Sequence, residues 1–325
     1  MTMQESIISL PIGKQRKYNF QFIPTRVCIP IGMACNVKCK YCMRLAGKIR
    51  EPKGLSDLMR EFLKQLNPAT TEAVIINGGE PLLYMDRIKE VFSLVPKPIH
   101  KACMTNGTLL TQEIVDYFNE NSVELHFSHE GTAAKYLKGV DVLEDPKIVN
   151  LLNQIKSMRI YTILTGSNWD VVANYEYILS KLNKVEKLWY STFPMFAFAG
   201  NEELAKGFDF AKYGRSIIEL RERYPQASEP SSYHSRYQRN SGFMVLPDGS
   251  VASLSTLKRY GTVLDPKEKL YQRAKELGDF DYCDSQDCSI REYCCVAKQC
   301  ATPFTCKAQR ISCQALEFKR GQNVF

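Results

Sequence analysis

The sequence lacks the long apolar run and the N-terminal signal that mark membrane and secreted proteins. No stretch of about 18 uninterrupted apolar residues occurs in the chain. The first residues, Met-Thr-Met-Gln-Glu-Ser, lack the basic and then apolar order of a secretory signal peptide. We therefore expect a cytoplasmic protein without a membrane-spanning segment.

Acidic residues are the scarcer of the two charge types. The 43 Lys and Arg residues outnumber the 35 Asp and Glu residues, which gives a formal net charge of +8. Such a charge can attract an acidic peptide or a nucleic acid, but it governs encounter and solubility rather than identity. A solvated basic surface explains it equally well. The 325 residues, 44% of them hydrophobic, allow a large core in one domain or in one domain plus an appendage.

Cysteine, by contrast, is abundant and unevenly placed. Twelve cysteines in a reducing compartment indicate metal or redox chemistry rather than disulfide bonds. Seven of them lie between Cys283 and Cys313. Three others, Cys35, Cys39 and Cys42, are separated by three and then two residues. No pair of histidines near these three completes the four-ligand arrangement that structural zinc usually takes.

The spacing of Cys35, Cys39 and Cys42 suits an iron-sulfur cluster. Three thiols placed in this way can surround one face of a cubane cluster, and they leave one iron without a ligand from the protein. An open iron beside soft thiolates can bind a small chelating molecule. Zinc and buried thiols are the alternatives.

From residue 26 onward, apolar strands alternate with amphipathic helices. Strand patterns cover 26–31, 73–77, 100–105, 124–128, 161–165 and 187–193. Helical periodicity follows each of them, over 55–66, 88–95, 114–118, 146–158, 171–182 and 210–223. This order predicts an α/β fold, a parallel sheet with crossover helices on its outer side. Residues 1–22 form a polar extension, in which the alternation over 18–22 predicts a short edge strand.

The cysteine group resembles the C-x3-C-x2-C signature of the radical S-adenosylmethionine (SAM) superfamily, in which an aromatic residue precedes the last cysteine. Tyr41 occupies that place. Gly78, Gly79 and Glu80 follow the second strand and resemble the family's G-G-E-P motif, which holds the methionine amine of SAM. The resemblance implies a partial (β/α)6 TIM-like barrel with a SAM-binding [4Fe-4S] cluster at the carboxyl end of its strands.

Two further motifs resemble this family. Asn106 lies in a T-N-G sequence after the third strand. Ser128 and Glu130 lie in a sequence that resembles the S-x-D-G of peptide-modifying members, where the serine reaches the ribose or carboxylate of the cofactor. This chain has glutamate in place of aspartate and lacks the arginine that commonly follows, so Lys135 or Lys138 is the candidate substitute. Asn106 and Ser128 are equally well explained as helix caps.

The resemblance implies a defined chemistry. SAM chelates the open iron, accepts an electron, and breaks its bond between sulfur and C5′. The resulting 5′-deoxyadenosyl radical removes a hydrogen atom from the substrate. An external electron donor such as flavodoxin or ferredoxin is then required, together with a cap that keeps water out of the mouth of the barrel.

The C-terminal region resembles the SPASM and twitch extensions of radical SAM maturases. Residues 243–254 predict a hairpin with a Pro-Asp-Gly turn, a helix follows near 270–277, and the cysteine-rich segment comes after it. Family members with two auxiliary clusters carry cysteines just before the hairpin and at its second strand. This chain has Ser241 and Ser253 there, so we expect no auxiliary cluster at that end.

We expect one auxiliary [4Fe-4S] cluster in the cysteine-rich segment. Its expected ligands are Cys283, Cys288 and Cys294, with a fourth from Cys300, Cys306 or Cys313. Zinc is the alternative, because four thiolates of irregular spacing suit it too. The number of cysteines also leaves room for a second auxiliary centre. The expected domains are the extension 1–22, the barrel 23–225 and the auxiliary-cluster domain 226–325.

The combination implies a radical SAM enzyme that modifies a ribosomal peptide or a protein. Cross-linking, thioether formation, oxidation of Ser or Cys, epimerisation and backbone excision are the candidate reactions. The basic charge suits an acidic leader peptide, which we expect the N-terminal extension, the barrel rim or a partner protein to recognise. The alternatives are a small-molecule dehydrogenase or cyclase of the same superfamily, an RNA-modifying enzyme, and a non-catalytic iron-sulfur electron carrier.

Two cysteines lie in predicted strands away from these motifs. Cys28 or Cys103 could donate a hydrogen atom to a substrate radical, as an epimerase needs, if its thiol pointed into the barrel. A place in the core is the alternative, since cysteine is among the most buried residue types.

Overall fold

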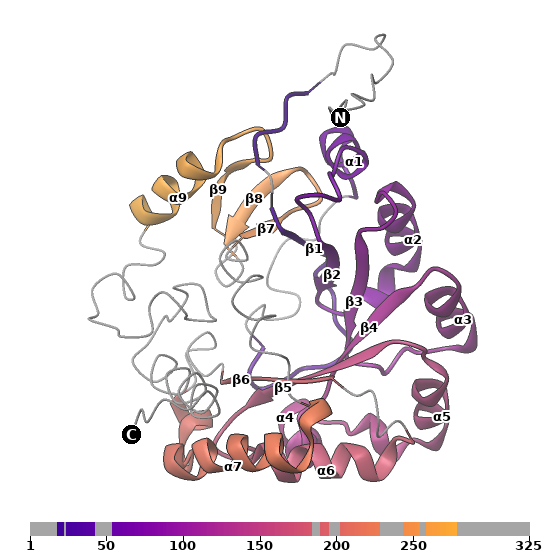
Figure 1. The fold of residues 1–325 in the computed structure, drawn as a ribbon, viewed down its shortest axis with the longest axis vertical. Helices are drawn as coiled ribbons and strands as arrows, with labels where there is room; N and C mark the ends of the chain where they lie inside the picture. The colour runs from indigo at the N-terminus through magenta and orange to yellow at the C-terminus, as the bar shows by residue number, and fades with distance from the viewer. Residues whose placement is uncertain are drawn as a thin grey trace, which may run out of the picture.

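Six parallel strands form the main sheet of the molecule. The computed structural model describes residues 18–22, 24–42, 54–183, 189–194, 202–227, 243–253 and 258–277. The strand order is β1-β2-β3-β4-β5-β6, and every neighbouring pair is parallel. Each strand therefore lies beside its neighbour in the sequence, and the connecting helices cover the outer side of the curved sheet (Figure 1). This is the partial (β/α)6 arrangement that the sequence predicts.

The strand and helix bounds follow the predicted alternation. The strands are β1 (Arg26–Gly32), β2 (Ala73–Gly78), β3 (His100–Thr105), β4 (Val123–Ser128), β5 (Met158–Leu164) and β6 (Trp189–Pro194). The helices between and after them are α1 (Asp57–Lys64), α2 (Met85–Leu94), α3 (Gln112–Glu120), α5 (Pro146–Gln154), α6 (Val171–Lys181) and α7 (Phe210–Arg223). Ser56 caps α1 as expected, because its side chain accepts a hydrogen bond from the N–H of Met59.

The two faces of the sheet have different surroundings. Val27, Ile29 and Ile31 of β1 belong to the main core that the helices cover. Side chains alternate along a strand, so the intervening residues point the other way. We call this opposite side the inner face. The inner-face residues used below are Cys28, Ala73, Ile75, His100, Ala102, Glu124, His126, Ser128, Arg159 and Tyr161.

The segment between β4 and α5 departs from the prediction. It forms η2 (Gly131–Ala133), the five-residue helix α4 (Ala134–Lys138) and η3 (Val142–Glu144). Elements this short repeat their apolar positions too few times to be recognised. β5 also begins at Met158, a residue that helical periodicity had assigned to the preceding helix.

The predicted edge strand over 18–22 is wrong, because these residues form no strand. Instead, the apolar side chains of this segment pack against the rest of the molecule. The ring of Phe20 lies 5.4 Å from that of Phe62, centroid to centroid, and Phe22 is buried. The N–H of Phe22 donates to the carbonyl of Val263 in a turn, at 3.3 Å.

A small antiparallel sheet lies beside β1 (Figure 1). It consists of β7 (Phe243–Val245), β8 (Ser250–Ser253) and β9 (Arg259–Thr262), and α9 (Lys267–Glu276) follows it. The predicted hairpin and helix are thus confirmed, whereas β9 was not expected. The N–H of Ser56 donates to the carbonyl of Pro247 at 2.9 Å, which joins the hairpin turn to the start of α1.

Candidate functional site

The predicted motifs meet at one edge of the main sheet. Parallel strands place the loops that follow them at the same edge, which is where α/β proteins bind ligands. The cysteine loop follows β1, the Gly-Gly motif ends β2, the T-N-G motif ends β3, and the Ser128 motif ends β4. Contacts between these loops, described below, turn the four motifs into one site.

Cys35, Cys39 and Cys42 are partly exposed thiols of a single loop. The N–H of Cys42 donates to the carbonyl of Cys39 at 3.1 Å, which keeps the last turn of the loop tight. Burial raises the pKa of Cys35, and it raises the pKa of Cys39 to about 12. Without a metal these two groups are therefore thiols, and a bound metal ion would be needed to remove their protons.

The donor set fits the cluster that the sequence predicts. The described ranges contain five cysteines, of which Cys28 and Cys103 lie in strands, so the loop supplies three thiols and no fourth. The side-chain amide of Asn106 lies 3.9 Å from the sulfur of Cys35 and donates to it. Hydrogen bonds of this kind stabilise the negative charge on a ligating sulfur. Three soft donors and one amide suit a [4Fe-4S] cluster with an open iron.

Gly78 and Gly79 bring the end of β2 against the start of the cysteine loop. The N–H of Gly79 donates to the carbonyl of Gly32 at 2.9 Å, and the next N–H donates to the carbonyl of Ala34 at 2.8 Å. A Cβ on Gly79 would lie 2.2 Å from the oxygen of Ala34, and Gly78 has a φ of 146°. Side chains are therefore excluded here, because two backbones approach each other closely.

Glu80 is committed to the chain's own hydrogen-bond donors. Its side chain is fully buried. One carboxylate oxygen accepts from the N–H of Leu82 at 3.0 Å and from the hydroxyl of Thr105 at 2.7 Å, and the other accepts from the N–H of Asn106 at 2.9 Å. Burial raises the pKa of Glu80 despite these bonds. The carboxylate thus ties the Gly-Gly motif to the T-N-G motif, and this placement favours the backbone of the glycines as the part that meets a ligand.

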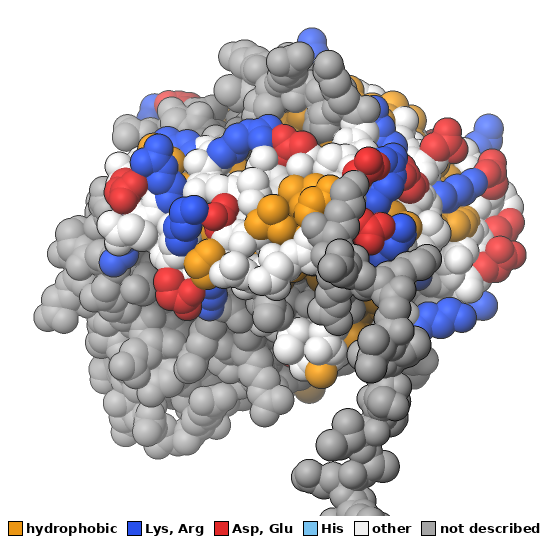
Figure 2. All heavy atoms as spheres, turned by 90° about the horizontal axis from the view of Figure 1, so that it is seen from above, with side chains coloured by type: hydrophobic (Ala, Val, Ile, Leu, Met, Phe, Trp, Pro, Cys, Tyr) orange, Lys and Arg blue, Asp and Glu red, His pale blue; other side chains and the backbone are white. Residues whose placement is uncertain are grey.

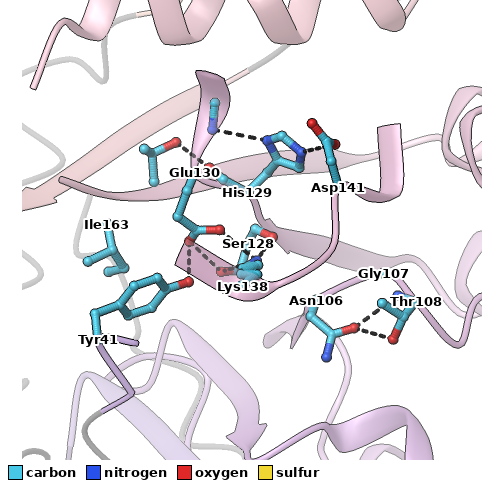
Figure 3. A network of polar contacts seen from close by, with 12 residues as sticks. Tyr41, Asn106, Gly107, Thr108, Ser128, His129, Glu130, Lys138, Asp141 and Ile163 are labelled. Atoms are coloured by element: carbon cyan, nitrogen blue, oxygen red, sulfur yellow. Dashed lines mark hydrogen bonds and ion pairs between the residues drawn. The ribbon is translucent and has the colours of Figure 1, made fainter. Parts of the chain in front are cut away.

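Asn106 links the T-N-G motif to the cysteine loop. Its amide nitrogen donates to the side-chain oxygen of Asn36 at 3.1 Å. Its oxygen accepts from the N–H of Thr108 at 2.9 Å and also from the hydroxyl of that residue (Figure 3). Asn36 donates in turn to Thr108 at 2.7 Å. Asn106 therefore closes the turn after β3 and fixes the loop that carries Cys35. The helix cap predicted for Asn106 is wrong, because Thr111 caps α3, and its contact with the cofactor stays a prediction.

A buried charged network lies beside the cysteine loop (Figure 3). The hydroxyl of Tyr41 donates to the carboxylate of Glu130, whose other oxygen lies 2.9 Å from the ammonium of Lys138. Lys138 also donates to the backbone carbonyl of Ser128, and to its hydroxyl at 3.2 Å. The side chains of Lys138 and Glu130 are 4% and 0% exposed, so the ion pair is shielded from water.

The structure separates the two lysines proposed to replace the family's arginine. The side chain of Lys135 is 72% exposed and pairs with Glu144 at 3.2 Å, away from the motifs. Lys138 lies at the site and acts electrostatically on Cys39. Lys138 is therefore the better candidate for the cation beside a bound cofactor.

His129 braces the turn that carries Glu130. The N–H of Gly131 donates to Nδ1 of His129 at 3.1 Å, so the other nitrogen carries the proton and donates to Asp141 at 2.9 Å (Figure 3). The hydroxyl of Tyr177 donates to the second oxygen of Asp141 at 2.6 Å. These contacts hold the backbone on both sides of Glu130 in place.

The two strand cysteines face opposite sides of the sheet. Cys103 is 0% exposed and belongs to the core between the sheet and the helices. Cys28 packs on the inner face against Ala73, Ile75 and Ala102. Of the two, only Cys28 lies on the side from which a hydrogen atom could be donated into the barrel.

The expected auxiliary-cluster ligands lie outside the described residues. They are Cys283, Cys288, Cys294, Cys300, Cys306 and Cys313.

Several site residues were not found from the sequence. Asn36 lies between two predicted cluster ligands, and Thr108 lies two residues after Asn106. Their closeness in the sequence to predicted site residues was the only signal by which they could have been found. His129 lies between Ser128 and Glu130 in the motif that resembles S-x-D-G, a position for which the sequence predicts no role. Asp141 and Tyr177 gave no signal, because the contacts from His129 to Asp141 and from Tyr177 to Asp141 depend on how β4, η3 and α6 pack.

Comparison with known families identifies this arrangement. The model of the Radical SAM superfamily matches residues 29–186, which run from β1 and the cysteine loop to the end of α6. This stretch, just under half of the chain, is similar to the radical SAM superfamily. The similarity implies SAM and a [4Fe-4S] cluster as cofactors.

The chain is similar to enzymes that mature proteins and peptides. It is 29% identical over 176 residues to the serine-type anaerobic sulfatase-maturating enzyme of Bacteroides thetaiotaomicron, an alignment that covers 47% of this chain and 41% of that enzyme. The chain thus matches less than half the length of this curated relative.

Solved structures show the same fold over most of the chain. The structure of anSMEcpe with bound AdoMet has a TM-score of 0.64 at 16% identity and covers 91% of this chain and 97% of that one. Streptococcus suis SuiB bound to the precursor peptide SuiA has a TM-score of 0.59 at 16% identity and covers 88% of this chain and 73% of that one. At these identities the similarity establishes the fold. Within the described ranges, no helix combines the length and the apolar character needed to cross a membrane.

Proposed function

We propose that this chain is a peptide-modifying radical SAM enzyme. The observation that carries the proposal is the convergence of the cysteine loop, the Gly-Gly backbone and the buried Tyr41-Glu130-Lys138 network at one sheet edge. Bound to Cys35, Cys39 and Cys42, the cluster and SAM together would supply the 5′-deoxyadenosyl radical that abstracts hydrogen from the substrate.

The residues around the cysteines have the chemistry that SAM requires. SAM carries an ammonium, a carboxylate and ribose hydroxyls. Lys138 offers a buried cation, while Glu130 and Ser128 offer acceptors beside it. The backbone of Gly78 and Gly79 passes next to the cysteine loop without side chains. We propose that these groups orient the cofactor, with Lys138 replacing the arginine that related enzymes use.

A peptide or protein substrate is favoured by the relatives. One is named as a serine-type sulfatase-maturating enzyme, and SuiB is described with a bound precursor peptide. Oxidation of a peptide serine is therefore the first reaction to test, ahead of cross-linking, thioether formation, epimerisation and backbone excision. A leader-recognition partner and an external flavodoxin or ferredoxin belong to the same proposal.

Charge gives weaker support for an acidic leader. The formal net charge is +8. On the face seen in Figure 2, however, Lys and Arg side chains lie interspersed with Asp and Glu rather than gathered into one basic field. An acidic segment would have to bind elsewhere on the surface or to a local basic group.

We retain one auxiliary [4Fe-4S] cluster in the extension 226–325 as part of the proposal. Cys283, Cys288 and Cys294 remain the expected ligands, with the fourth from Cys300, Cys306 or Cys313. Such a centre would accept the electron that a substrate radical releases on oxidation.

Anaerobic turnover tests the proposal. The reconstituted enzyme, SAM and dithionite should yield 5′-deoxyadenosine, measured by liquid chromatography and mass spectrometry. Cys39→Ala should abolish the product, whereas Lys135→Ala, at an exposed position, should not. Intact clusters without 5′-deoxyadenosine would instead indicate an electron carrier.

A peptide library tests the substrate class. A serine peptide oxidised by the enzyme loses two hydrogen atoms, which mass spectrometry detects directly. Enhanced 5′-deoxyadenosine formation with small metabolites or RNA, and none with peptides, would contradict a peptide substrate.

A further inference from the structure

A polar cluster lies on the inner face of the sheet, closer to the amino ends of the strands than the candidate cofactor site. The carboxylate of Glu124 lies 3.1 Å from Nε2 of His100 and 2.7 Å from Nε2 of His126. The Nε of Arg159 lies 3.6 Å from the same oxygen. Burial would raise the pKa of Glu124, but the two histidines and the charge of Arg159 outweigh it and hold that pKa well below its usual range. The carboxylate is therefore ionised.

The ionised carboxylate fixes the tautomer of His126. A carboxylate can only accept, so Nε2 of His126 must carry a proton and donate it to Glu124. Burial lowers the pKa of His126, so the ring is neutral and its Nδ1 is an unprotonated acceptor. This is the relation by which a carboxylate orients the imidazole of a catalytic triad.

The acceptor nitrogen of His126 has no hydrogen-bond partner among the described residues. The side chain is 4% exposed, so bulk water does not reach it. Buried polar atoms are nearly always paired, and an exception in a native protein requires an explanation, such as a catalytic role or a bound partner. The neutral, oriented ring selects a hydrogen-bond donor and gives a carboxylate ligand no donor to bind.

The position of His126 relates this acceptor to the cofactor site. It lies two residues before Ser128 on the same face of β4, about 6.6 Å along the strand. Ser128, which contacts Lys138, is the next residue of this face toward the carboxyl end of β4. The ring of Tyr161, 4.9 Å away between centroids, closes one side.

We propose that Nδ1 of His126 is a substrate subsite, which accepts a hydrogen bond from the hydroxyl of a serine residue. The identity of the ligand rests on the proposed function, whereas the acceptor itself rests only on the contacts of Glu124 and His126. Glu124 is a positioning residue, because it acts on the ligand through His126.

A metal ion is the competing occupant of this cluster. The ligand atoms of His100, Glu124 and His126 lie within 4.8 Å of one another. A cation would have to displace the Nε2 protons and tolerate the nearby charge of Arg159. We therefore favour the hydrogen-bonding ligand and make the metal an outcome of the test.

Nitrogen NMR of the full-length holoenzyme tests the proposal. The chain has four histidines, so a sample labelled with ¹⁵N in the imidazole ring gives few signals. The signals of His100, His126 and His129 can be assigned by substituting these residues one at a time. The probes are N-acetyl-L-serinamide and N-acetyl-L-alaninamide, which differ by one hydroxyl. We expect an unprotonated Nδ1 in His126 that shifts to lower frequency with the serine probe and not with the alanine probe.

Substitutions provide the matched controls. His126→Asn keeps an oxygen near the position of Nδ1 and should keep part of the preference for the serine probe. His126→Leu should lose it, with a 3- to 10-fold weaker affinity for that probe, about the contribution of one hydrogen bond. Affinity for the alanine probe should not change.

Three results would overturn the proposal: a protonated Nδ1, equal shifts with both probes, or no shift at saturating probe. Displacement of the Nε2 protons of His100 and His126 by one equivalent of Zn²⁺ would assign the cluster to a metal instead. The same samples are assayed for 5′-deoxyadenosine. Product without a His126 response would remove the subsite alone, and a response without product would remove the proposed function alone.

Discussion

Glu130 and Lys138 form an ion pair that water does not reach. Removing one partner of such a pair leaves a buried charge uncompensated, which typically costs about 3–5 kcal/mol. Lys138→Ala should therefore lower the free energy of unfolding by about that amount in urea titrations. Lys135→Ala removes an exposed lysine from the same short helix and should change it by less than about 0.5 kcal/mol. Equal effects of the two substitutions would contradict a buried pair.

Asp141 should make stability depend on pH in a narrow range. Burial alone would raise its pKa, but the hydrogen bonds from His129 and Tyr177 outweigh it and bring the pKa from 3.8 to about 2. A lowered pKa stabilises the fold above 3.8, and this contribution is lost as the pH falls toward 2.

The Asp141→Asn variant tests this pH dependence. Between pH 5 and pH 3 its free energy of unfolding should fall less than that of the unmodified chain, by about 1 kcal/mol after allowance for solvent screening. The exposed Asp116→Asn is the control and should follow the unmodified chain. Parallel pH profiles of all three proteins would show that Asp141 carries no such contribution.

Single residues were predictable where their signal was local. The spacing of Cys35, Cys39 and Cys42 is a property of one loop, so the sequence alone located these thiols. The choice between Lys135 and Lys138 was not predictable, because it depends on the rotation of α4 about its axis. Likewise, nothing adjacent to Glu80 indicates that its carboxylate binds Thr105 and Asn106 on another strand.

At the scale of whole elements, prediction succeeded where a pattern repeats. β1 to β4 and the helices α1, α6 and α7 lie within a few residues of their expected bounds, because several apolar positions mark each of them. The short elements α4, η2 and β9 were not predicted from the sequence. These elements are held by tertiary contacts, such as the bond from the N–H of Lys40 to the carbonyl of Leu137, that leave no periodic trace.

The start of α6 offers a test at this scale. Asp170 caps the helix, because its carboxylate accepts from the N–H groups of Val172 and Ala173, and it also accepts from the hydroxyl of Ser216 on α7. Asp170→Ala should lower the free energy of unfolding by about 1–2 kcal/mol. Asp170→Asn retains an acceptor oxygen and should cost less. Thermal unfolding of both variants measures this, and an equal loss would show that the cap itself contributes little.

For the whole molecule, the proposal implies two separate iron sites. The triple variant Cys35→Ala, Cys39→Ala and Cys42→Ala should lose about four iron atoms per chain relative to the unmodified protein. Iron bound by the cysteine-rich segment should remain, together with its absorption and electron paramagnetic resonance signals. Loss of all iron in the triple variant would contradict independent sites.

The topology of the main sheet could be predicted from the sequence, but the placement of the small sheet beside it could not. The order of strand and helix patterns predicted the parallel sheet. The placement of the small sheet beside β1 depends on contacts such as those between Ser56 and Pro247 and between Phe22 and Val263. Partners so far apart in the sequence leave no local signal by which they could be matched.

That placement has a consequence for how the protein is made. Among the described strands, β1 is translated first and forms one end of the sheet order, whereas β7, which packs next to it, is translated only after all six strands of the main sheet. Until then the nascent chain displays an open strand edge next to three cysteine thiols, an arrangement prone to aggregation. Iron delivery and chaperone release are therefore best timed to follow the synthesis of β7, when the small sheet can cover β1.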